Sequence, residues 1–314
     1  MKTVFLNIGR MNYDQKLNLD IFPEDVIYYK ESKQEEIIER VKGCEVVMSK
    51  ELPLPAALIE QFPDEVRMIC EAGTGYNNID LAACRRKGII VCNTPAYSTQ
   101  RVAHTAIMLL LNLSSSMKKQ LRMMQEGDYT NFYQHMVVDH TEVNGKILGI
   151  IGAGNIGKAV IRIAKAMDMK ILVYTRTPRM DEEGITYVSF EELLEHSDYV
   201  SLHCPLNDTT YHMMNQKAFQ LMKKTAFLIN TSRGALVDEE ALLDALRNHE
   251  LAGAGLDVQE IEPLPVDHPF YTMDEVMLTP HMGWRGLETR QRLIELVAAN
   301  IEAYAKGSPI NVLV

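Results

Sequence analysis

The chain has 314 residues, enough for about two domains of ordinary size. It carries 32 Lys and Arg against 42 Asp and Glu, so its net charge is −10, and this balance argues against nucleic acid or an anionic membrane as the main partner. With 46% hydrophobic and 24% charged residues, the composition is typical of a globular enzyme and excludes extended disorder.

The sequence shows no membrane segment, disulfide framework or metal motif. The longest apolar run, residues 106–111, is far shorter than the roughly 20 residues that a membrane crossing needs. Asn7 interrupts the N-terminal apolar segment too early for the hydrophobic region of a secretory signal. The five cysteines have no C-x-x-C spacing, which favours reduced thiols in a cytoplasmic protein. The nine histidines form no H-x-x-x-H pair, so we expect no bound metal.

Strand-like and helix-like segments alternate through the first third of the chain. We expect strands at residues 3–8, 26–29, 45–48, 67–70 and 89–92. Among the helical patterns between them, residues 34–41 place Ile37, Ile38 and Val41 on one face. Such alternation predicts a parallel sheet covered by helices.

A long apolar helix is expected after Ser98, followed by a loop with a short helix at 127–144. A second α/β series then begins. Its expected strands are 147–151, 171–174, 199–202, 226–230, 252–256 and 276–278, and its helices 156–167, 190–195, 216–221, 239–248 and 287–305. The chain is thus predicted to be an α/β protein with two doubly wound parallel-sheet domains, the second beginning near residue 98.

A glycine-rich turn follows the strand at 147–151 directly and opens a helix. Gly152 permits a tight turn, Gly154 allows main chain to approach a pyrophosphate, and Gly157 allows the helix to pack closely on the strand. The helix N-terminus adds free N–H groups and a positive dipole end. Glycines also punctuate ordinary turns, but the strand–turn–helix context favours a dinucleotide-binding site.

The next strand lacks the acidic residue that binds an NAD ribose in such folds. It is followed by Thr175, Arg176 and Arg179 instead. A guanidinium pairs with a 2′-phosphate, which a carboxylate would repel. The alternatives are that these arginines are solvated loop charges or that Arg176 stacks on adenine, and Asp181 and Glu182 follow closely, but we favour NADP over NAD.

Polar residues follow three other strands of the second series: Arg233 after 226–230, Asp257 and Glu262 after 252–256, and His281 after 276–278. Because the carboxyl ends of parallel strands share one edge, we expect these side chains near the glycine turn. An Arg can bind a carboxylate in a bidentate manner, and a His beside a carboxylate can exchange a proton with a carbonyl oxygen. Each residue alone could be a capping or turn residue.

With these motifs, the sequence resembles the D-2-hydroxyacid dehydrogenase family, specifically its glycerate dehydrogenase/hydroxypyruvate reductase branch. The resemblance runs from about Met68 to Val314 and is carried by residues 73–80, 93–98, 152–157, 230–234, 256–263 and 280–284. It implies a Rossmann-type cofactor domain at 99–284 and a discontinuous, flavodoxin-like substrate domain at 1–98 and 285–314. It also implies a homodimer that uses the helix after Ser98.

The resemblance implies roles for individual residues. His281 would be the general acid/base, Glu262 would hold it, and Arg233 would bind the substrate carboxylate and carbonyl. The main-chain N–H groups of Thr74 and Gly75 would bind the carboxylate too. The residues implied at the cofactor are Gly152, Gly154, Asn155, Ile156, Gly157, Thr175, Arg176, Cys204, Thr231, Asp257, His281 and Gly283. Cys204 could instead be a nucleophile, although a lining role is favoured.

The expected activity is reversible reduction of a small 2-oxo acid by NAD(P)H, with hydroxypyruvate or glyoxylate favoured. Residues 128–143 match the family poorly, so a bulkier 2-oxo acid stays open. A dinucleotide-sensing regulatory protein is the second alternative, because related corepressors keep the same three catalytic residue types.

Overall fold

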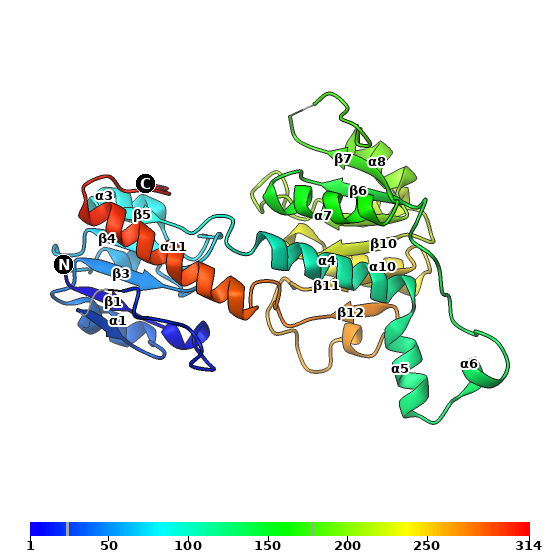
Figure 1. Ribbon diagram of the computed structural model, residues 1–314, viewed down its shortest axis with the longest axis horizontal. Helices are drawn as coiled ribbons and strands as arrows, with labels where there is room; N and C mark the ends of the chain where they lie inside the picture. The colour runs from blue at the N-terminus through cyan, green and yellow to red at the C-terminus, as the bar shows by residue number, and fades with distance from the viewer. Residues whose placement is uncertain (23–24, 178) are drawn as a thin grey trace. The chain divides into compact units, whose positions relative to one another are not determined.

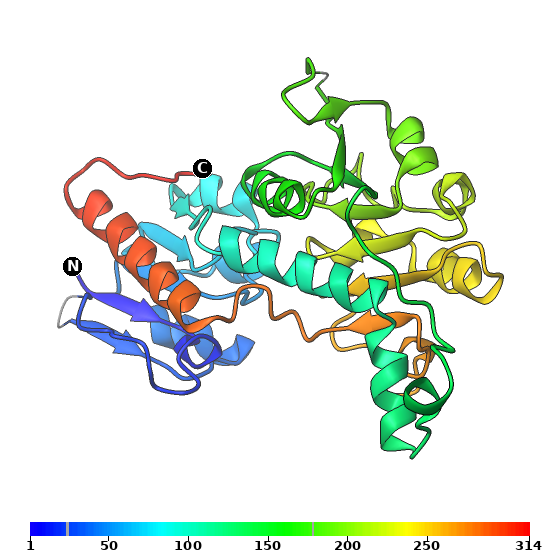
Figure 2. The ribbon, with the colours of Figure 1, turned by 45° about the vertical axis from the view of Figure 1, so that its right-hand side comes forward.

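The computed structural model describes residues 1–22, 25–177 and 179–314. It divides into two compact units, one made of Met1–Ser98 with Trp284–Val314 and the other of Thr99–Gly283. In Figures 1 and 2 each unit is a sheet flanked by helices. The chain returns to the first unit at Trp284, one residue earlier than the expected boundary.

The first unit contains a parallel sheet in the order β2-β1-β3-β4-β5. Its strands are β1 (Thr3–Phe5), β2 (Val26–Tyr28), β3 (Val46–Ser49), β4 (Met68–Glu71) and β5 (Ile90–Cys92). Its helices are η1 (Ile8–Arg10), α1 (Gln34–Val41), α2 (Ala56–Ile59), α3 (Leu81–Lys87) and α11 (Leu287–Ala305).

Both faces of this sheet are buried. Residues of α1, α2 and α3 pack on one face around Val47 and Ile69. On the other face, α11 packs Leu293 and Val297 against Phe5 and other strand residues. The near-continuous apolar strands of the sequence therefore reflect a sheet that is covered on both sides.

The second unit contains a parallel sheet in the order β12-β11-β10-β9-β6-β7-β8. Its strands are β6 (Ile147–Ile151), β7 (Lys170–Tyr174), β8 (Thr186–Tyr187), β9 (Tyr199–Leu202), β10 (Phe227–Asn230), β11 (Gly253–Leu256) and β12 (Val276–Leu278). Its helices are α4 (Thr99–Ser114), α5 (Met117–Gln125), α6 (Thr130–Tyr133), α7 (Asn155–Ala166), α8 (Phe190–His196), α9 (Gln216–Leu221), η2 (Gly234–Leu236), α10 (Glu239–Arg247) and η3 (Pro269–Tyr271).

Helices cover both faces of the second sheet as well. Residues of α4 and α7 pack on one face, and those of α8, α9 and α10 pack on the other. Since β6 lies between β9 and β7, the strand order reverses at β6. Ligands of open parallel sheets bind at such a reversal, outside the carboxyl ends of the strands.

The predicted α/β fold with two parallel sheets is confirmed, and each expected strand is present. The ends shift by one residue at most except in the strand expected at 3–8, which stops at Phe5 because the 3-10 helix η1 begins at Ile8. The sequence did not predict β8, whose two residues are too few to show a period, or α5 as a helix separate from α4. Within the described ranges, no helix is both long and apolar enough to cross a membrane.

Candidate active site

The turn after β6 needs glycine at two positions. Gly152 has a φ of +97°, and a Cβ there would lie 2.8 Å from the main chain of His203 and Cys204. A Cβ at Gly157 would lie 2.2 Å from the Gly152 carbonyl oxygen. The turn after β6 therefore packs tightly against the start of α7 and against the turn after β9.

Gly154 differs from these two glycines, because a Cβ there would meet nothing within 4 Å. It lies at the N-cap of α7, a helix of 12 residues. The first main-chain N–H groups of this helix have no partner within the helix and point toward this end. Buried polar atoms without a hydrogen-bond partner in the described structure follow two nearby strands, namely Thr231 Oγ1 after β10 and His203 Nδ1 after β9. An open cradle with N–H groups and unsatisfied polar atoms fits a dinucleotide pyrophosphate and its attached groups.

His203 was missed by the sequence prediction, although it directly follows β9 at the ligand-binding edge. Its Nε2 lies 2.9 Å from Ser201 Oγ. Burial lowers the pKa of His203 to about 4, so the ring is neutral at physiological pH. Burial raises the pKa of the Cys204 thiol to about 11, and this sulfur contacts Met213 Sδ at 3.6 Å. A protonated thiol of this kind is suited to lining a cleft, and poorly suited to nucleophilic attack.

The loop after β7 presents Thr175 and Arg176. The Thr175 hydroxyl donates to the Thr177 carbonyl at 2.7 Å, and Arg176 is exposed. Pro178 lies outside the described residues.

The acidic residues that follow this loop are held by β8. Asp181 Oδ1 accepts from the Tyr187 main-chain N at 2.8 Å. Glu182 Oε1 accepts from the Tyr187 hydroxyl at 3.1 Å, and Arg179 hydrogen-bonds the same tyrosine side chain. One oxygen of each carboxylate is thus bonded to Tyr187.

His281 and Glu262 form a pair at the opposite end of the same sheet edge. His281 Nδ1 lies 2.8 Å from Glu262 Oε2, with side-chain exposures of 27% and 33%. Glu262 Oε1 accepts from the Gln259 main-chain N at 3.1 Å, which orients the carboxylate. A carboxylate on Nδ1 selects the proton-bearing form of that nitrogen and leaves Nε2 to exchange a proton with a ligand.

Asp257 has a structural task that the sequence did not predict. Its buried carboxylate accepts from the Thr279 hydroxyl at 2.6 Å and from the main-chain N of Met282 at 2.9 Å and of Gly283 at 2.8 Å. Between these donors lies His281, with a φ of +48°, a conformation that non-glycine residues rarely adopt. The Asp257 carboxylate therefore holds the turn that aims the imidazole.

Arg233 follows β10, and its half-buried side chain donates to the Ser232 carbonyl at 2.7 Å. The Asn230 side chain fixes its main chain by donating to the Arg233 carbonyl at 2.8 Å. A Cβ at Gly234 would lie 1.9 Å from the Gln259 carbonyl carbon. The turn that carries Arg233 thus packs directly on the loop that carries Glu262.

Thr74 and Gly75 belong to the first unit, in the loop after β4. The Thr74 hydroxyl donates to the Thr94 carbonyl at 3.1 Å, and the Asn93 side chain donates to the Thr74 carbonyl at 2.8 Å. Thr74 itself is exposed. This loop is therefore anchored while its outer surface stays accessible.

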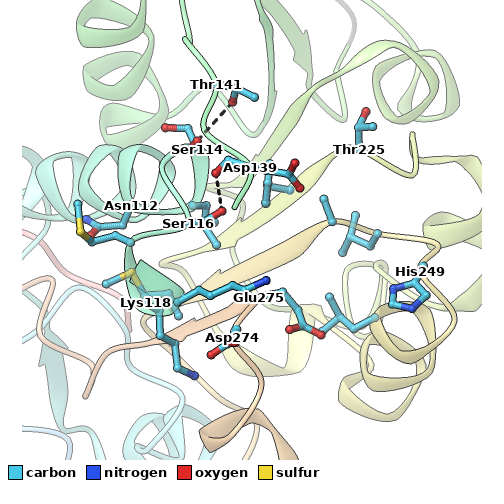
Figure 3. Close-up of a pocket in the computed structure, with 18 of the residues that line it drawn as sticks. Asn112, Ser114, Ser116, Lys118, Asp139, Thr141, Thr225, His249, Asp274 and Glu275 are labelled. Atoms are coloured by element: carbon cyan, nitrogen blue, oxygen red, sulfur yellow. Dashed lines mark hydrogen bonds between the residues drawn. The ribbon is translucent and has the colours of Figure 1, made fainter. Parts of the chain in front are cut away.

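A cavity of about 610 Å³ lies at the other end of the second sheet. Its lining includes Thr225 and Glu275 (Figure 3), which precede β10 and β12, whereas Arg233 and His281 follow these strands. The Lys118 ammonium in its wall donates to main-chain carbonyls, among them that of Met273 at 2.6 Å. None of the predicted site residues lines this cavity.

Comparison with known proteins gives a consistent result. Residues 107–283 match the model of the D-isomer specific 2-hydroxyacid dehydrogenase NAD-binding domain. A glyoxylate reductase of Korarchaeum cryptofilum is 39% identical over 95% of this chain and 90% of its own. The chain belongs to the D-isomer specific 2-hydroxyacid dehydrogenase family.

Two further relatives align over at least 98% of this family member. A hydroxypyruvate reductase of Blautia hydrogenotrophica is 35% identical over 98% of this chain and 96% of its own. A solved acyclic imino acid reductase, in complex with NADPH and D-Arg, superposes with a TM-score of 0.86 at 29% identity and covers all of both chains. This dehydrogenase is therefore an oxidoreductase of 2-oxo and 2-hydroxy acids, with an NAD(P)-binding domain in its second unit.

Proposed function

We propose that this dehydrogenase reduces hydroxypyruvate or glyoxylate, reversibly, with NADPH as the favoured cofactor. The observation that supports this proposal most directly is the 2.8 Å contact between His281 Nδ1 and Glu262 Oε2. This pair lies on the sheet edge that also presents Arg233 and the glycine turn. The names of the relatives, glyoxylate reductase and hydroxypyruvate reductase, support these two small substrates.

In this proposal each residue has a separate task. His281 donates a proton from Nε2 to the carbonyl oxygen of the 2-oxo acid, and Glu262 stabilises the imidazolium through Nδ1. Arg233 binds the carboxylate and carbonyl oxygens, for which a planar guanidinium is well suited. When bound, the nicotinamide supplies the hydride, and residues 152–157 with Thr231, Asp257 and Gly283 would hold the cofactor.

The substrate carboxylate has a second proposed contact in the first unit. The main-chain N–H groups of Thr74 and Gly75 lie in an anchored loop that is open on its outer side. Consecutive N–H groups in such a turn bind anions well. In this proposal the loop binds the substrate carboxylate, and Arg233 binds both the carboxylate and the carbonyl group.

The preference for NADPH rests on the loop after β7. Arg176 is exposed there, and Asp181 and Glu182 each bond to Tyr187 through one oxygen. An exposed guanidinium in place of the usual acidic residue at this strand end favours a 2′-phosphate over a ribose hydroxyl. Replacement of Arg176 by Ala should therefore raise the KM for NADPH and leave that for NADH nearly unchanged.

A panel of rates at 340 nm tests the proposed function. NADH and NADPH are each combined with hydroxypyruvate, glyoxylate, pyruvate and 2-oxoisocaproate, and H281A is the control. We expect the highest kcat/KM with NADPH and one of the first two acids, and a loss in H281A of about 10²–10⁴ in rate. Near-normal turnover in H281A contradicts the mechanism, and preference for 2-oxoisocaproate contradicts the substrate assignment. NADPH binding without turnover of any acid favours a nucleotide-sensing role.

We also propose that the protein is a homodimer. The segment from α5 through α6 extends away from the second sheet (Figure 1). It carries exposed apolar side chains, including Phe132 at 73% and Tyr133 at 84% exposure. Monomeric proteins rarely expose such clusters, so contact with a second copy of the chain would explain them.

A cytoplasmic location completes the proposal. The five cysteines all lie in the described residues and carry free thiols. Cys70 and Cys92 are direct neighbours across β4 and β5 and are still unbonded, which suits a reducing compartment. Fractionation of cells that produce the tagged protein tests this location.

A further inference from the structure

A buried lysine follows β3 in the first unit and is not part of the mechanism above. Lys50 is only 1% exposed. The Asn7 side chain clamps its main chain, because Asn7 Nδ2 donates to the Lys50 carbonyl at 2.7 Å and Asn7 Oδ1 accepts from the Lys50 N at 2.9 Å. A buried ammonium is costly unless it is paired, so the residues around Lys50 indicate what it does.

The Lys50 ammonium has three kinds of partner. Its Nζ lies 2.6 Å from Glu51 Oε1 and 4.3 Å from the centre of the Trp284 ring, and it interacts electrostatically with the Tyr97 side chain. Burial by itself lowers the pKa of Lys50, but the oxygens of Tyr97, Glu51 and Glu71 together hold this pKa above its ordinary value. Lys50 is therefore a charged group inside the protein.

The substrate loop lies directly on this charge. A Cβ at Gly73 would be 3.3 Å from both Lys50 Nζ and Glu71 Oε1. Glu71 is fully buried as well, and it accepts from Ser49 Oγ at 3.0 Å and from the Glu51 main-chain N at 2.7 Å. The loop that continues with Thr74 and Gly75 thus packs on the Lys50 ammonium and on the hydrogen-bonded Glu71 carboxyl group.

The other partners of Lys50 occupy special positions in the chain. The first unit runs from Met1 to Ser98 and resumes at Trp284. Tyr97 therefore stands next to the point where the chain leaves this unit, and Trp284 is the residue at which it returns. One ammonium contacts both connecting segments and supports the substrate loop.

We infer that Lys50 is a positioning residue that holds the 73–75 loop and both connecting segments in one arrangement, and thereby sets the affinity for the 2-oxo acid. The inference rests on the proposed binding of the substrate carboxylate by Thr74 and Gly75. Lys50 is enclosed, so it acts through these segments and does not touch the substrate. Removal of its charge leaves the buried Glu71 and the Tyr97 hydroxyl without their cation and releases the loop.

Steady-state kinetics of K50M, K50R and wild type test this inference, with K87M as the matched control. Lys87 is a partly buried lysine of the same unit that donates to the Phe62 carbonyl at 2.7 Å, away from the substrate loop. We expect K50M to raise the KM for hydroxypyruvate or glyoxylate at least tenfold, with the dissociation constant of NADPH changed less than twofold. K50R should recover part of the loss because it keeps the charge, and K87M should behave as wild type.

Y97F provides a second test that removes one hydroxyl and little volume, in case K50M folds poorly. It should raise the same KM by a smaller factor. Trp284 is the single tryptophan of the chain, so its emission in K50M and Y97F, titrated with the non-reducible analogue oxamate and NADPH, reports binding without turnover. Wild-type KM and oxamate affinity in K50M, or in Y97F where K50M does not fold, overturn the inference. A wild-type protein that neither turns over an acid nor binds oxamate overturns the proposed function, and the inference with it.

Discussion

The geometry of His281 depends on Asp257, a residue outside the proton-transfer pair. The Asp257 carboxylate accepts three hydrogen bonds from residues 279–283 while His281 adopts a left-handed backbone conformation. In D257N an amide NH₂ replaces one acceptor oxygen and faces a main-chain donor. A broken buried hydrogen bond of this kind costs about 1–3 kcal/mol, so we expect kcat/KM to fall about tenfold to hundredfold.

Parallel assays of D257N and D244N check this prediction. Asp244 is an exposed residue of α10, and its replacement removes the same charge from the same unit. Circular dichroism establishes that both variants are folded. Activity of D257N within twofold of D244N would show that the turn keeps its shape without the carboxylate.

Glu71 couples the stability of the protein to pH. Burial raises the pKa of Glu71 from its ordinary 4.5 to about 7, although Lys50 and three hydrogen bonds oppose this shift. The folded protein then keeps a proton up to about pH 7 that the unfolded chain releases near pH 4.5. The contribution of Glu71 to the free energy of unfolding is full below pH 4.5 and is lost as the pH rises to about 7.

Thermal unfolding of wild type, E71Q and E65Q at pH 5 and pH 8 measures this contribution. Glu65 is an exposed glutamate of the same unit. We expect the loss of Tm between the two pH values to be smaller in E71Q than in wild type, and unchanged in E65Q. An equal pH dependence in E71Q would mean that Glu71 is already ionised at pH 5.

At the level of elements, the turn between β6 and α7 contains glycines with separable tasks. In G157A the new Cβ would lie 2.2 Å from the Gly152 carbonyl oxygen, so α7 must move away from β6. Such overpacking costs about 1–3 kcal/mol, and Tm should fall. In G154A the new Cβ meets nothing within 4 Å, so Tm should hold while the dissociation constant of NADPH rises at least tenfold.

This pair of variants separates a structural glycine from a ligand-contacting one. Calorimetric titration with NADPH and thermal unfolding of both proteins supply the two measurements. The assignment of the Gly154 turn to the cofactor pyrophosphate is wrong if G154A binds NADPH as tightly as wild type does. Loss of stability in G154A would instead reveal a contact made by the protein itself.

The elements were largely predictable because their signals are local. Alternating apolar segments, the glycine turn and the polar residues after β10, β11 and β12 each occupy a few consecutive positions. The two-residue β8 has no period to detect. His203 follows the same strand-end rule as its neighbour Cys204, but its unsatisfied Nδ1 becomes apparent only when burial is known.

At the level of the whole molecule, the contacts that the sequence could not predict join distant segments. Lys50, Glu71, Tyr97 and Trp284 form one cluster, although 234 positions separate the first residue from the last. Asp257 and the turn that carries His281 likewise follow two different strands, β11 and β12, and are joined by hydrogen bonds between them. Neither arrangement has a sequence pattern, since each results from the order of strands in a sheet.

The exposed aromatic residues of α6 allow the proposed homodimer to be tested. α6 contributes no buried residue, so replacing Phe132 and Tyr133 by Ser removes nothing from the core. If these side chains pack against a second copy of the chain, the double variant should lose the apolar contact area and dissociate to a monomer of about 35.6 kDa. Light scattering after size-exclusion chromatography measures the mass, with V266S, which alters a side chain that is 97% exposed outside this segment, as the control. A wild-type protein that is already monomeric at micromolar concentration would leave the exposed aromatic side chains without this role.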